Sequence, residues 1–352
     1  MTWDLSPGAW LLALDWAIRL AALAWIPHRT TPPAARSWLL LVFFVPLLGL
    51  PLYLLFGHPW LSRQRILRQA QASQAIRVGQ APQAALRWRR SGRMDLRNHR
   101  KLAVIDDDIA HVGSQNLAAA EFVRGHPNRE LVARVRGPVV AHLEAVFASD
   151  WYLETGEVLD VSPTRPSQPE RVATQLLASG PAYPFDNARD SVNALIHLAQ
   201  RRLVLTTPYF VPDDALLAAL RIAALSGVEV QLILSAPNNQ RLTEWAQHSY
   251  YDGLLACGVR IALYRPRFLH AKHLSVDDGI ALIGSINLDI RSFALNAEIG
   301  LFCYDRGVVA RMREIEADYL RDAEQLSLDA WRARPTWRRS LEGVARLADS
   351  FM

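Results

Sequence analysis

Lysine is nearly absent from this chain. Its 352 residues include 39 lysines and arginines, and of these only Lys101 and Lys272 are lysines. Arginine offers a planar fork of donors, whereas lysine offers a compact point charge on a flexible stem. Since arginine meets every other need for positive charge, we expect the two lysines to have a specific chemical role.

Cysteine is just as scarce. Cys257 and Cys303 are the only two, and they lie in apolar surroundings without the spacing of metal ligands. This excludes a disulfide framework and a cysteine-based zinc site. We expect two reduced core thiols in a cytoplasmic domain.

Both lysines belong to an internal repeat. HRKLAVID, residues 99–106, matches HAKHLSVD, residues 270–277. Each copy reads as strand, turn, strand, loop, strand and helix, which predicts two copies of one supersecondary unit. At offsets of 171 and then 168 residues, the matched pairs are His99 and His270, Lys101 and Lys272, Asp106 and Asp277, Gly113 and Gly284, Ser114 and Ser285, Asn116 and Asn287, Glu130 and Glu298, and Asp150 and Asp318.

The repeat predicts a pocket for a phosphate diester. On a strand, residues i and i+2 share a face, so His99 lies beside Lys101 and His270 beside Lys272. If the copies pack about a pseudo-twofold axis, two imidazoles and two ammonium groups meet. The ammonium groups would balance the phosphate oxygens, one imidazole would attack phosphorus, and the other would protonate the leaving oxygen.

Two further pairs could support this chemistry. Asn116 and Asn287 could donate to the same oxygens, and Glu130 and Glu298 could each hold an imidazole in the required tautomer. The aspartates differ, since they follow their histidines by seven positions. Strand parity therefore places Asp106 and Asp277 on the opposite face, which favours a structural role.

The paired motifs resemble the phospholipase D superfamily. The second copy with its flanks, HAKHLSVDDGIALIGSINLDIRSFALNAEIGL, closely resembles bacterial cardiolipin synthases of the phospholipase D type, as does TTPYFVPDDALLAAL at 206–220. The resemblance implies an α/β fold of two pseudo-symmetric lobes, with mixed β-sheets flanked by helices. It implies a phosphohistidine formed from one phosphatidylglycerol, then attack by a second to give cardiolipin and glycerol. It implies no metal or organic cofactor.

The resemblance also implies roles for individual residues. Asp106 and Asp277 join the catalytic set by resemblance only, against the parity argument. The implied catalytic set is His99, Lys101, Asp106, His270, Lys272 and Asp277, and the supporting set is Ser114, Asn116, Glu130, Ser285, Asn287 and Glu298.

The amino-terminal sixty residues predict a two-helix transmembrane hairpin. Trp38–Phe56 is a run of nineteen residues without a charge, long enough to cross a bilayer. Pro46, Gly49 and Pro51 would kink this helix, which membrane helices tolerate. Ala9–Ile26 is a weaker span, where Asp15 and Arg19 can pair on one helical face. No lysine or arginine precedes this segment, which disfavours a cleaved signal peptide.

Arginines follow the apolar region in the basic segment 61–93, which predicts a multi-pass protein of the bacterial cytoplasmic membrane whose large domain faces the cytoplasm. The net charge of +5 suits anionic phospholipids such as phosphatidylglycerol, and suits nucleic acid equally. No basic groove with interleaved aromatics is visible, so we expect no nucleic-acid partner. An oligomer is possible.

The two lobes are unequal in length. Before its motif, the second lobe predicts helix 191–200, strand 202–210, helix 213–226, strand 228–236, helix 241–258 and strand 259–265. The first lobe lacks about two such βα units. It could dock on the second lobe and complete the site, be covered by another subunit, or leave the site too loose. We assign 1–60 to the hairpin, 61–93 to a basic membrane-proximal segment, 94–160 to a shortened first lobe, 161–175 to a linker, 176–326 to the second lobe and 327–352 to an amphipathic tail.

Several alternatives stay open from sequence. Water in place of the acceptor alcohol would make the protein a phospholipase D-type hydrolase, and an incomplete site would leave a catalytically weak lipid-binding relative. The stretch YFVPDD, residues 209–214, either caps a helix through Asp213 or Asp214 or lies near the pocket. The carboxy-terminal tail is either an interfacial helix or a packed terminal helix.

Overall fold

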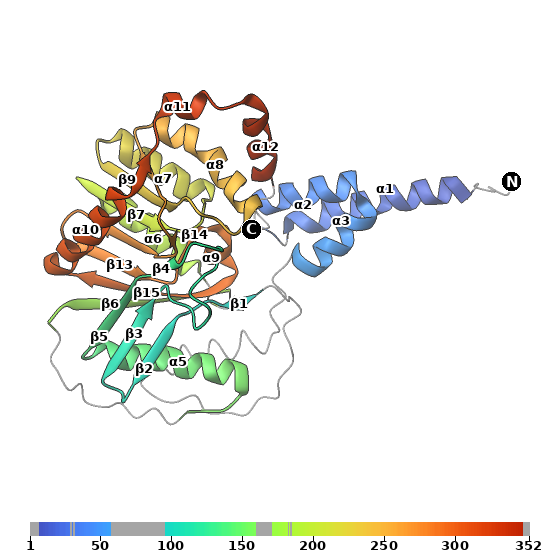
Figure 1. Cartoon of the computed structure of the whole chain (residues 1–352). Coiled ribbons are helices and arrows are strands. Elements are labelled where there is room, and N and C mark those ends of the chain that lie inside the picture. Colours follow the sequence, from blue (N-terminus) through green and yellow to red (C-terminus); the bar gives the residue numbers. More distant parts are fainter. Residues whose placement is uncertain are drawn as a thin grey trace. The chain divides into compact units, whose positions relative to one another are not determined.

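The computed structural model describes residues 7–28, 30, 32–57, 96–159, 171–181, 183 and 185–347. They fall into two compact units, a helical unit of residues 7–57 and an α/β unit of residues 97–347 (Figure 1). The basic segment 61–93 and most of the predicted linker lie outside the described residues.

The helical unit contains one helix that could cross a membrane. Helix α1 (Pro7–Trp25) continues into the short η1 (Ile26–His28), and Trp10–His28 is long and apolar enough by length and composition. The predicted pairing within it is confirmed, because Arg19 Nη2 lies 2.9 Å from Asp15 Oδ2.

The segment Trp38–Phe56, predicted as a kinked second span, does not form one helix of membrane-spanning length. The chain forms α2 (Pro32–Phe44), breaks at Val45, and continues as α3 (Pro46–Leu52) and η2 (Tyr53–Gly57). A residue before proline avoids the helical region, and Val45 accordingly has ψ of 68°. Helix α3 then packs closely on α2, since a Cβ on Gly49 would lie 2.8 Å from Leu41 O. At about 1.5 Å per residue, α2 spans only about 20 Å, short of the bilayer core.

The α/β unit is built on a nine-stranded mixed sheet in the order β1-β15-β13-β12-β7-β9-β10-β16, with β6 also pairing β15. The strands are β1 (Arg97–Asn98), β6 (Ala173–Ser179), β7 (Arg202–Thr207), β9 (Glu229–Ser235), β10 (Arg260–Tyr264), β12 (His273–Val276), β13 (Ile280–Gly284), β15 (Asn296–Tyr304) and β16 (Ala323–Gln325). Strands β7, β9 and β10 run parallel, and β12, β13 and β6 pair antiparallel with their neighbours. Strand β15 is antiparallel to β13 and β6 and parallel to β1.

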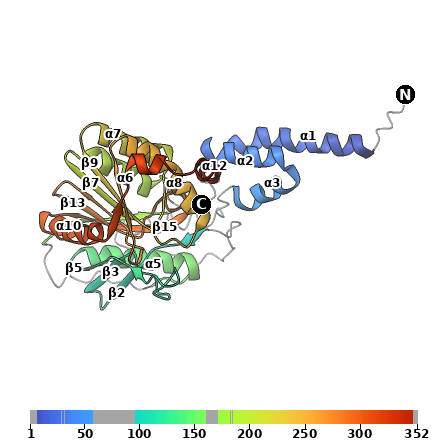
Figure 2. The ribbon, with the colours of Figure 1, turned by 45° about the horizontal axis from the view of Figure 1, so that its top comes forward.

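Helices cover one face of this sheet, and α10 (Arg306–Arg321) and the first lobe cover the other (Figure 2). The first face packs on a large apolar core beneath α6 (Asn187–Leu198), α7 (Asp214–Leu225) and α8 (Arg241–Ala256). The remaining helices are α5 (Val139–Thr155), α9 (Ile290–Ala294), α11 (Leu328–Arg332) and α12 (Thr336–Arg346). The alternation of strands and helices predicted for the second lobe is confirmed, although β6 begins at Ala173, inside the range assigned to the linker.

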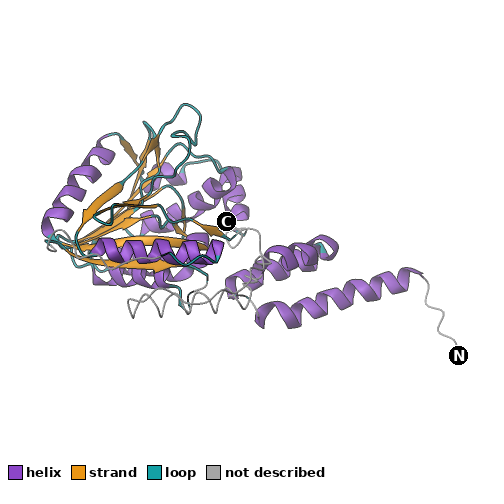
Figure 3. Ribbon diagram, turned by 90° about the horizontal axis from the view of Figure 1, so that it is seen from below, coloured by secondary structure: helices purple, strands orange, loops and turns teal. Residues whose placement is uncertain are grey.

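The shortened first lobe docks on the second. Its antiparallel sheet β2-β3-β5 consists of β2 (Leu102–Ile105), β3 (Ile109–Gly113) and β5 (Val132–Arg136). Val112 of this sheet and Leu143 of α5 share a buried cluster with Ile299 and Leu301 of β15. Helices flank the strands when the unit is seen from the α5 side (Figure 3). Of the outcomes open from sequence, the structure shows the docked arrangement.

A buried arginine joins the two lobes at this seam. The Arg100 side chain is only 5% exposed and forms an ion pair with Asp150 of α5. Its Nε donates to Glu298 O at 3.1 Å, and its Nη2 donates to Ser179 O at 3.0 Å. One guanidinium therefore fixes α5, β6 and β15 against the first-lobe motif, a use of the planar donor fork that lysine does not offer.

Candidate active site

Backbone pairing brings the two motif histidines together. Strand β1, just before His99, pairs in parallel with the start of β15, and β11 (Phe268–Leu269), just before His270, pairs in parallel with β4 (Asn128–Arg129). His99 N–H donates to Ala297 O and His270 N–H donates to Arg129 O, both at 2.9 Å. Each histidine is thus attached to a strand of the other lobe beside a motif glutamate, because β15 contains Glu298 and Glu130 directly follows β4. This confirms the expected pseudo-twofold arrangement.

The imidazoles exchange carboxylate partners between the lobes. His99 Nδ1 lies 2.9 Å from the Glu298 carboxylate, and His270 Nδ1 lies 2.8 Å from the Glu130 carboxylate. An ionised carboxylate accepts, so each Nδ1 carries the proton and each Nε2 is left for a substrate. Sequence assigned the glutamates to this role but did not show that each one serves the opposite lobe.

A serine holds each glutamate in place. Ser114 Oγ donates to Glu130 at 2.5 Å and accepts from Leu131 N–H at 2.9 Å. Ser285 Oγ likewise donates to Glu298 and accepts from Ile299 N–H at 3.0 Å. These bonds satisfy the second carboxylate oxygen and fix its direction, as second partners do around an oriented imidazole.

Lys272 is buried and Lys101 is half-buried, and each lies beside the histidine of its own motif. Lys101 Nζ donates to His99 O at 2.6 Å, and Lys272 Nζ donates to His270 O at 2.7 Å. Burial lowers the pKa of Lys101 to about 8 and that of Lys272 to about 7, although the negative charges of Glu130 and Glu298 act to raise both values. Lys101 also lowers the pKa of Lys272, so the ammonium groups face one site. A phosphate oxygen bound between them would stabilise their charged forms.

Three aromatic side chains, Phe122, Phe268 and Tyr209, form an aromatic wall beside His270. The ring centroid of Phe122, from the first lobe, lies 5.2 Å from the imidazole, and that of Phe268 lies 5.6 Å away. Tyr209 packs on Phe268 with centroids 6.1 Å apart. Burial, together with the charge of Lys272, lowers the pKa of His270 to about 4, which keeps its imidazole neutral at ordinary pH. The site therefore combines an anion-binding centre with an apolar side.

Comparison with known proteins identifies the family. The family model "Cardiolipin synthase, PLD-like domain" matches residues 58–151 and 192–319. The chain belongs to this family.

Curated relatives include "Cardiolipin synthase A" of Serratia proteamaculans, 37% identical over an alignment of 259 residues that covers 71% of this chain and 53% of that protein. "Cardiolipin synthase A" of Pectobacterium carotovorum matches over the same shares at 37% identity. The chain thus spans about half the length of the curated relatives it matches. Among solved structures, the phosphatidylserine synthase of Haemophilus influenzae shares the fold, with a TM-score of 0.53 at 15% identity over 72% of this chain and 71% of that one.

The aspartates of this cardiolipin synthase-like chain lie at the far end of the motif strands. Asp277 has φ of 47° and accepts backbone N–H bonds from Gln200 at 3.1 Å, Arg201 at 2.8 Å and Arg202 at 2.9 Å. Burial acts to raise the pKa of Asp277, but these bonds outweigh it and the pKa is lowered. The length of β12 separates this carboxylate from His270. Asp106 occupies the matching position after β2, with φ of 52°.

The motif asparagines occupy unequal positions. Asn287 is 6% exposed, and its Oδ1 has no hydrogen-bond partner among the described residues. The backbone N–H of Asn287 donates to Ser292 Oγ at 3.3 Å. Asn116 is half-buried in the loop after β3. A buried side-chain amide with an unused oxygen suits a polar group of a substrate.

Sequence reasoning missed Asp289 of β14 (Leu288–Asp289), which pairs with β8 (Phe210–Val211). The carboxylate is 7% exposed and accepts from Ser292 N–H at 2.6 Å at the start of α9. Burial, with the charge of Glu298, raises its pKa to about 6, and the charge of His99 lowers it. The repeat could have signalled this asymmetry, since the matching first-copy residue is Ala118.

The stretch 209–214 serves both functions weighed from sequence. Asp213 Oδ1 accepts from Leu216 N–H at 2.8 Å and caps α7, while Tyr209 joins the aromatic wall. No group of three or more His, Cys, Asp or Glu side chains in the described part of the chain is arranged as metal ligands.

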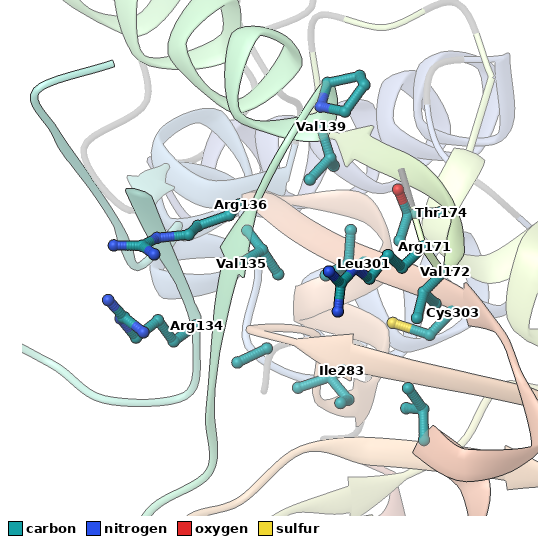
Figure 4. A pocket seen from close by; sticks show the side chains of 13 residues that line it. Arg134, Val135, Arg136, Val139, Arg171, Val172, Thr174, Ile283, Leu301 and Cys303 are labelled. Carbon is teal, nitrogen blue, oxygen red and sulfur yellow. The ribbon is translucent and has the colours of Figure 1, made fainter. Parts of the chain in front are cut away.

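A cavity of about 320 Å³ lies elsewhere, between β5 and β15 (Figure 4). It is lined mainly by apolar side chains, including Val135, Val172, Leu301 and Cys303, and by none of the motif residues. Burial raises the pKa of the Cys303 thiol to about 11, so this thiol stays protonated.

Proposed function

We propose that this protein is a phosphatidyltransferase that makes cardiolipin and glycerol from two molecules of phosphatidylglycerol. The observation that carries the proposal is the exchange of His–Glu pairs between the lobes, with one lysine beside each histidine. The family and the relatives named cardiolipin synthase A support the choice of lipid.

The first step transfers the phosphatidyl group to the protein. The phosphate of one phosphatidylglycerol lies between the ammonium groups of Lys101 and Lys272, with Asn116 and Asn287 as further donors. The Nε2 of one motif histidine attacks phosphorus, and the bond from phosphorus to the headgroup glycerol oxygen breaks. The other histidine, protonated, gives its proton to that oxygen, and glycerol leaves.

The second step reverses these roles. The histidine that gave its proton takes one from the headgroup hydroxyl of a second phosphatidylglycerol. The oxygen attacks phosphorus, the phosphorus–nitrogen bond breaks, and cardiolipin leaves with both imidazoles restored. Glu130 and Glu298 stabilise whichever imidazole is positively charged and keep both rings oriented throughout.

We assign Asp277, and by repeat Asp106, a positioning role. The Asp277 carboxylate fixes the turn after β12 on the start of β7 and contacts backbone N–H groups. We therefore place the chemistry on His99, Lys101, His270 and Lys272, with Glu130 and Glu298 as orienting groups and Ser114 and Ser285 behind them.

We also propose a location at the bacterial cytoplasmic membrane with the α/β unit facing the cytoplasm. Helix α1 is the described element long enough to cross. The arginines of residues 63–93 follow it, and positive charge collects on the cytoplasmic side. Such a segment attracts anionic headgroups by about 1 kcal/mol per basic residue near the surface.

The test uses membranes from a host that lacks its own cardiolipin synthases. The full chain is supplied with labelled phosphatidylglycerol, and the lipids are followed by mass spectrometry. We expect cardiolipin and glycerol in equal amounts, and neither from His99→Ala or His270→Ala. Release of phosphatidic acid in place of cardiolipin would make the protein a hydrolase, and lipid binding without turnover would make it a binding protein; either result overturns the proposal.

A further inference from the structure

Helix α12 turns its apolar side away from the protein. Glu342 and Ala345 are buried, at 5% and 3% exposed, whereas Trp337, Val344 and Leu347 are 59%, 63% and 61% exposed. A surface helix of a globular protein normally buries its apolar stripe against the core. The orientation of α12 is the reverse, so its apolar side is available to a partner outside the α/β unit.

Polar contacts fix this orientation. The Glu342 carboxylate accepts from both terminal nitrogens of Arg334, at 2.7 and 2.9 Å, and lies 3.5 Å from His248 Nδ1 of α8. Trp331 of α11, three residues before Arg334, packs on Tyr251 of α8 with ring centroids 5.0 Å apart. The helix is therefore held on α8 by its acidic residue, and the outward apolar side is a consequence of specific contacts.

The outward side has the composition of a bilayer-contacting helix. Trp337, Leu341, Val344 and Leu347 recur at intervals of four, three and three residues, which places them on one stripe. Interfacial helices combine such a stripe with tryptophan at the polar boundary and with basic residues beside it. The exposed basic residues of α12 are Arg338, Arg339 and Arg346.

A neighbouring part of α8 extends this surface toward the active site. Leu242 and Trp245, in the first two turns of α8, are 49% and 41% exposed. Helix α8 follows β9, whose last residue, Ser235, accepts through Oγ from Leu269 N–H at 3.0 Å. Leu269 immediately precedes His270, so the exposed end of α8 lies on the same edge of the sheet as the catalytic groups.

We propose that the stripe of α12, together with Leu242 and Trp245, is a membrane-contact surface that inserts into the headgroup–acyl boundary of an anionic bilayer. The arginines of α12 match the negative surface of such a bilayer, and tryptophan suits its boundary. The inference deepens the proposed function, since it holds the site at the surface where its substrates lie. Membrane contact itself does not depend on turnover, so it is tested separately.

The first test places a polarity-sensitive fluorophore on Val344→Cys in a Cys257→Ser background, using the full chain in nanodiscs that contain phosphatidylglycerol. Cys303 is buried and its raised pKa keeps it unreactive. The matched control is Leu225→Cys. Leu225 is the last residue of α7, is 70% exposed, and lies shortly before the start of β9, on the opposite edge of the sheet from the site.

We expect the label at residue 344 to be quenched by lipid-borne quenchers and protected from aqueous iodide, and the label at 225 to behave in the reverse way. Equal iodide access at both positions would overturn the proposal. Protection that grows with protein concentration at constant lipid would overturn it too, because the surface would then be covered by a second copy of the chain.

A second test compares Leu347→Glu with Leu225→Glu, two substitutions of the same type at 61% and 70% exposed leucines. For Leu347→Glu, we expect kcat/KM on bilayer phosphatidylglycerol to fall about tenfold relative to its own value on dispersed short-chain phosphatidylglycerol. No such change is expected for Leu225→Glu. Equal ratios in the two variants contradict the membrane contact. If the wild type shows no transferase activity, the proposed function fails while the fluorescence result still decides this inference.

Discussion

At the residue scale, each motif histidine depends on a carboxylate from the other lobe. Glu130→Gln keeps the size of the side chain but removes the charge that stabilises the His270 imidazolium and fixes its tautomer. We expect kcat to fall by about 10²- to 10⁴-fold while the fold is retained. The measurement is kcat with a thermal unfolding curve for each variant, and Glu298→Gln is expected to match.

The control for these variants is Glu229→Gln, at the opposite edge of the sheet, where the carboxylate pairs with Arg260 at the surface. Its kcat is expected to stay within about twofold of wild type, as for most surface substitutions. Full activity in both Glu130→Gln and Glu298→Gln would contradict the orienting role.

The lowered pKa values of Lys101 and Lys272 predict how activity changes with pH. Their pKa values of about 8 for Lys101 and about 7 for Lys272 lie below the usual lysine value, so the charged forms dominate below this range. As pH rises from 6 to 9, the ammonium groups lose protons and the attraction for the phosphate weakens. We expect kcat/KM for phosphatidylglycerol to decrease across this window, which a pH profile at constant ionic strength measures. A steady increase across it would contradict the assignment.

At the element scale, the strands of each lobe approach too closely for any residue but glycine. A Cβ on Gly284, the last residue of β13, would lie 2.2 Å from Ile299 O and 2.8 Å from Gly300 Cα. Gly284→Ala must push β13 away from β15 and move Ser285, which orients Glu298. We expect a loss of about 1–3 kcal/mol of stability together with lower kcat.

The matched variant is Gly253→Ala within α8, where an added Cβ has nothing within 4 Å. It is expected to raise stability by about 0.5–1 kcal/mol, as alanine does in a helix. Chemical unfolding of both variants checks the pair. Equal stability of the two would show that the close strand approach is unimportant.

Elements with a strong local pattern could be predicted from sequence. The apolar run of β7 and the capped helix α7 follow directly from LVLTT and from Asp213. The apolar run Trp38–Phe56 suggested one span kinked at its prolines, but not that Val45 would leave the helical region and divide the run into α2 and α3. The two-residue strands β1 and β11 could not be predicted, since only packing of the lobes creates their partners.

The same limit applies to the site. The residues proposed to be catalytic were predicted from the repeat, as was the proposed orienting role of the two glutamates. Which glutamate faces which histidine depends on contacts across 199 and 140 residues, which no local pattern contains. Phe122 was missed because its contact with His270 depends on the packing of the lobes, and Asp289 was missed because the matching first-copy residue is Ala118.

At the scale of the whole molecule, two unequal lobes share one site. The first lobe contributes a three-stranded sheet against the nine strands of the large sheet, yet Arg100 and the apolar seam hold it in register. The chain spans about half the length of the curated relatives it matches, and the proposed function requires the reduced lobe to place His99 and Lys101 correctly. The proposed chemistry requires the motif side chains of the first lobe to be placed within about 1 Å, since a larger error costs about a hundredfold in rate.

The most direct test is capture of the covalent intermediate. The full chain is mixed with an excess of phosphatidylglycerol, quenched with denaturant within one turnover, and examined by intact-protein and peptide mass spectrometry. We expect one phosphatidyl group per chain, attached to His99 or His270, and none in the variant that lacks both imidazoles. Cardiolipin formed at the full rate without an adduct on either histidine would contradict the account, as would an adduct on any other residue.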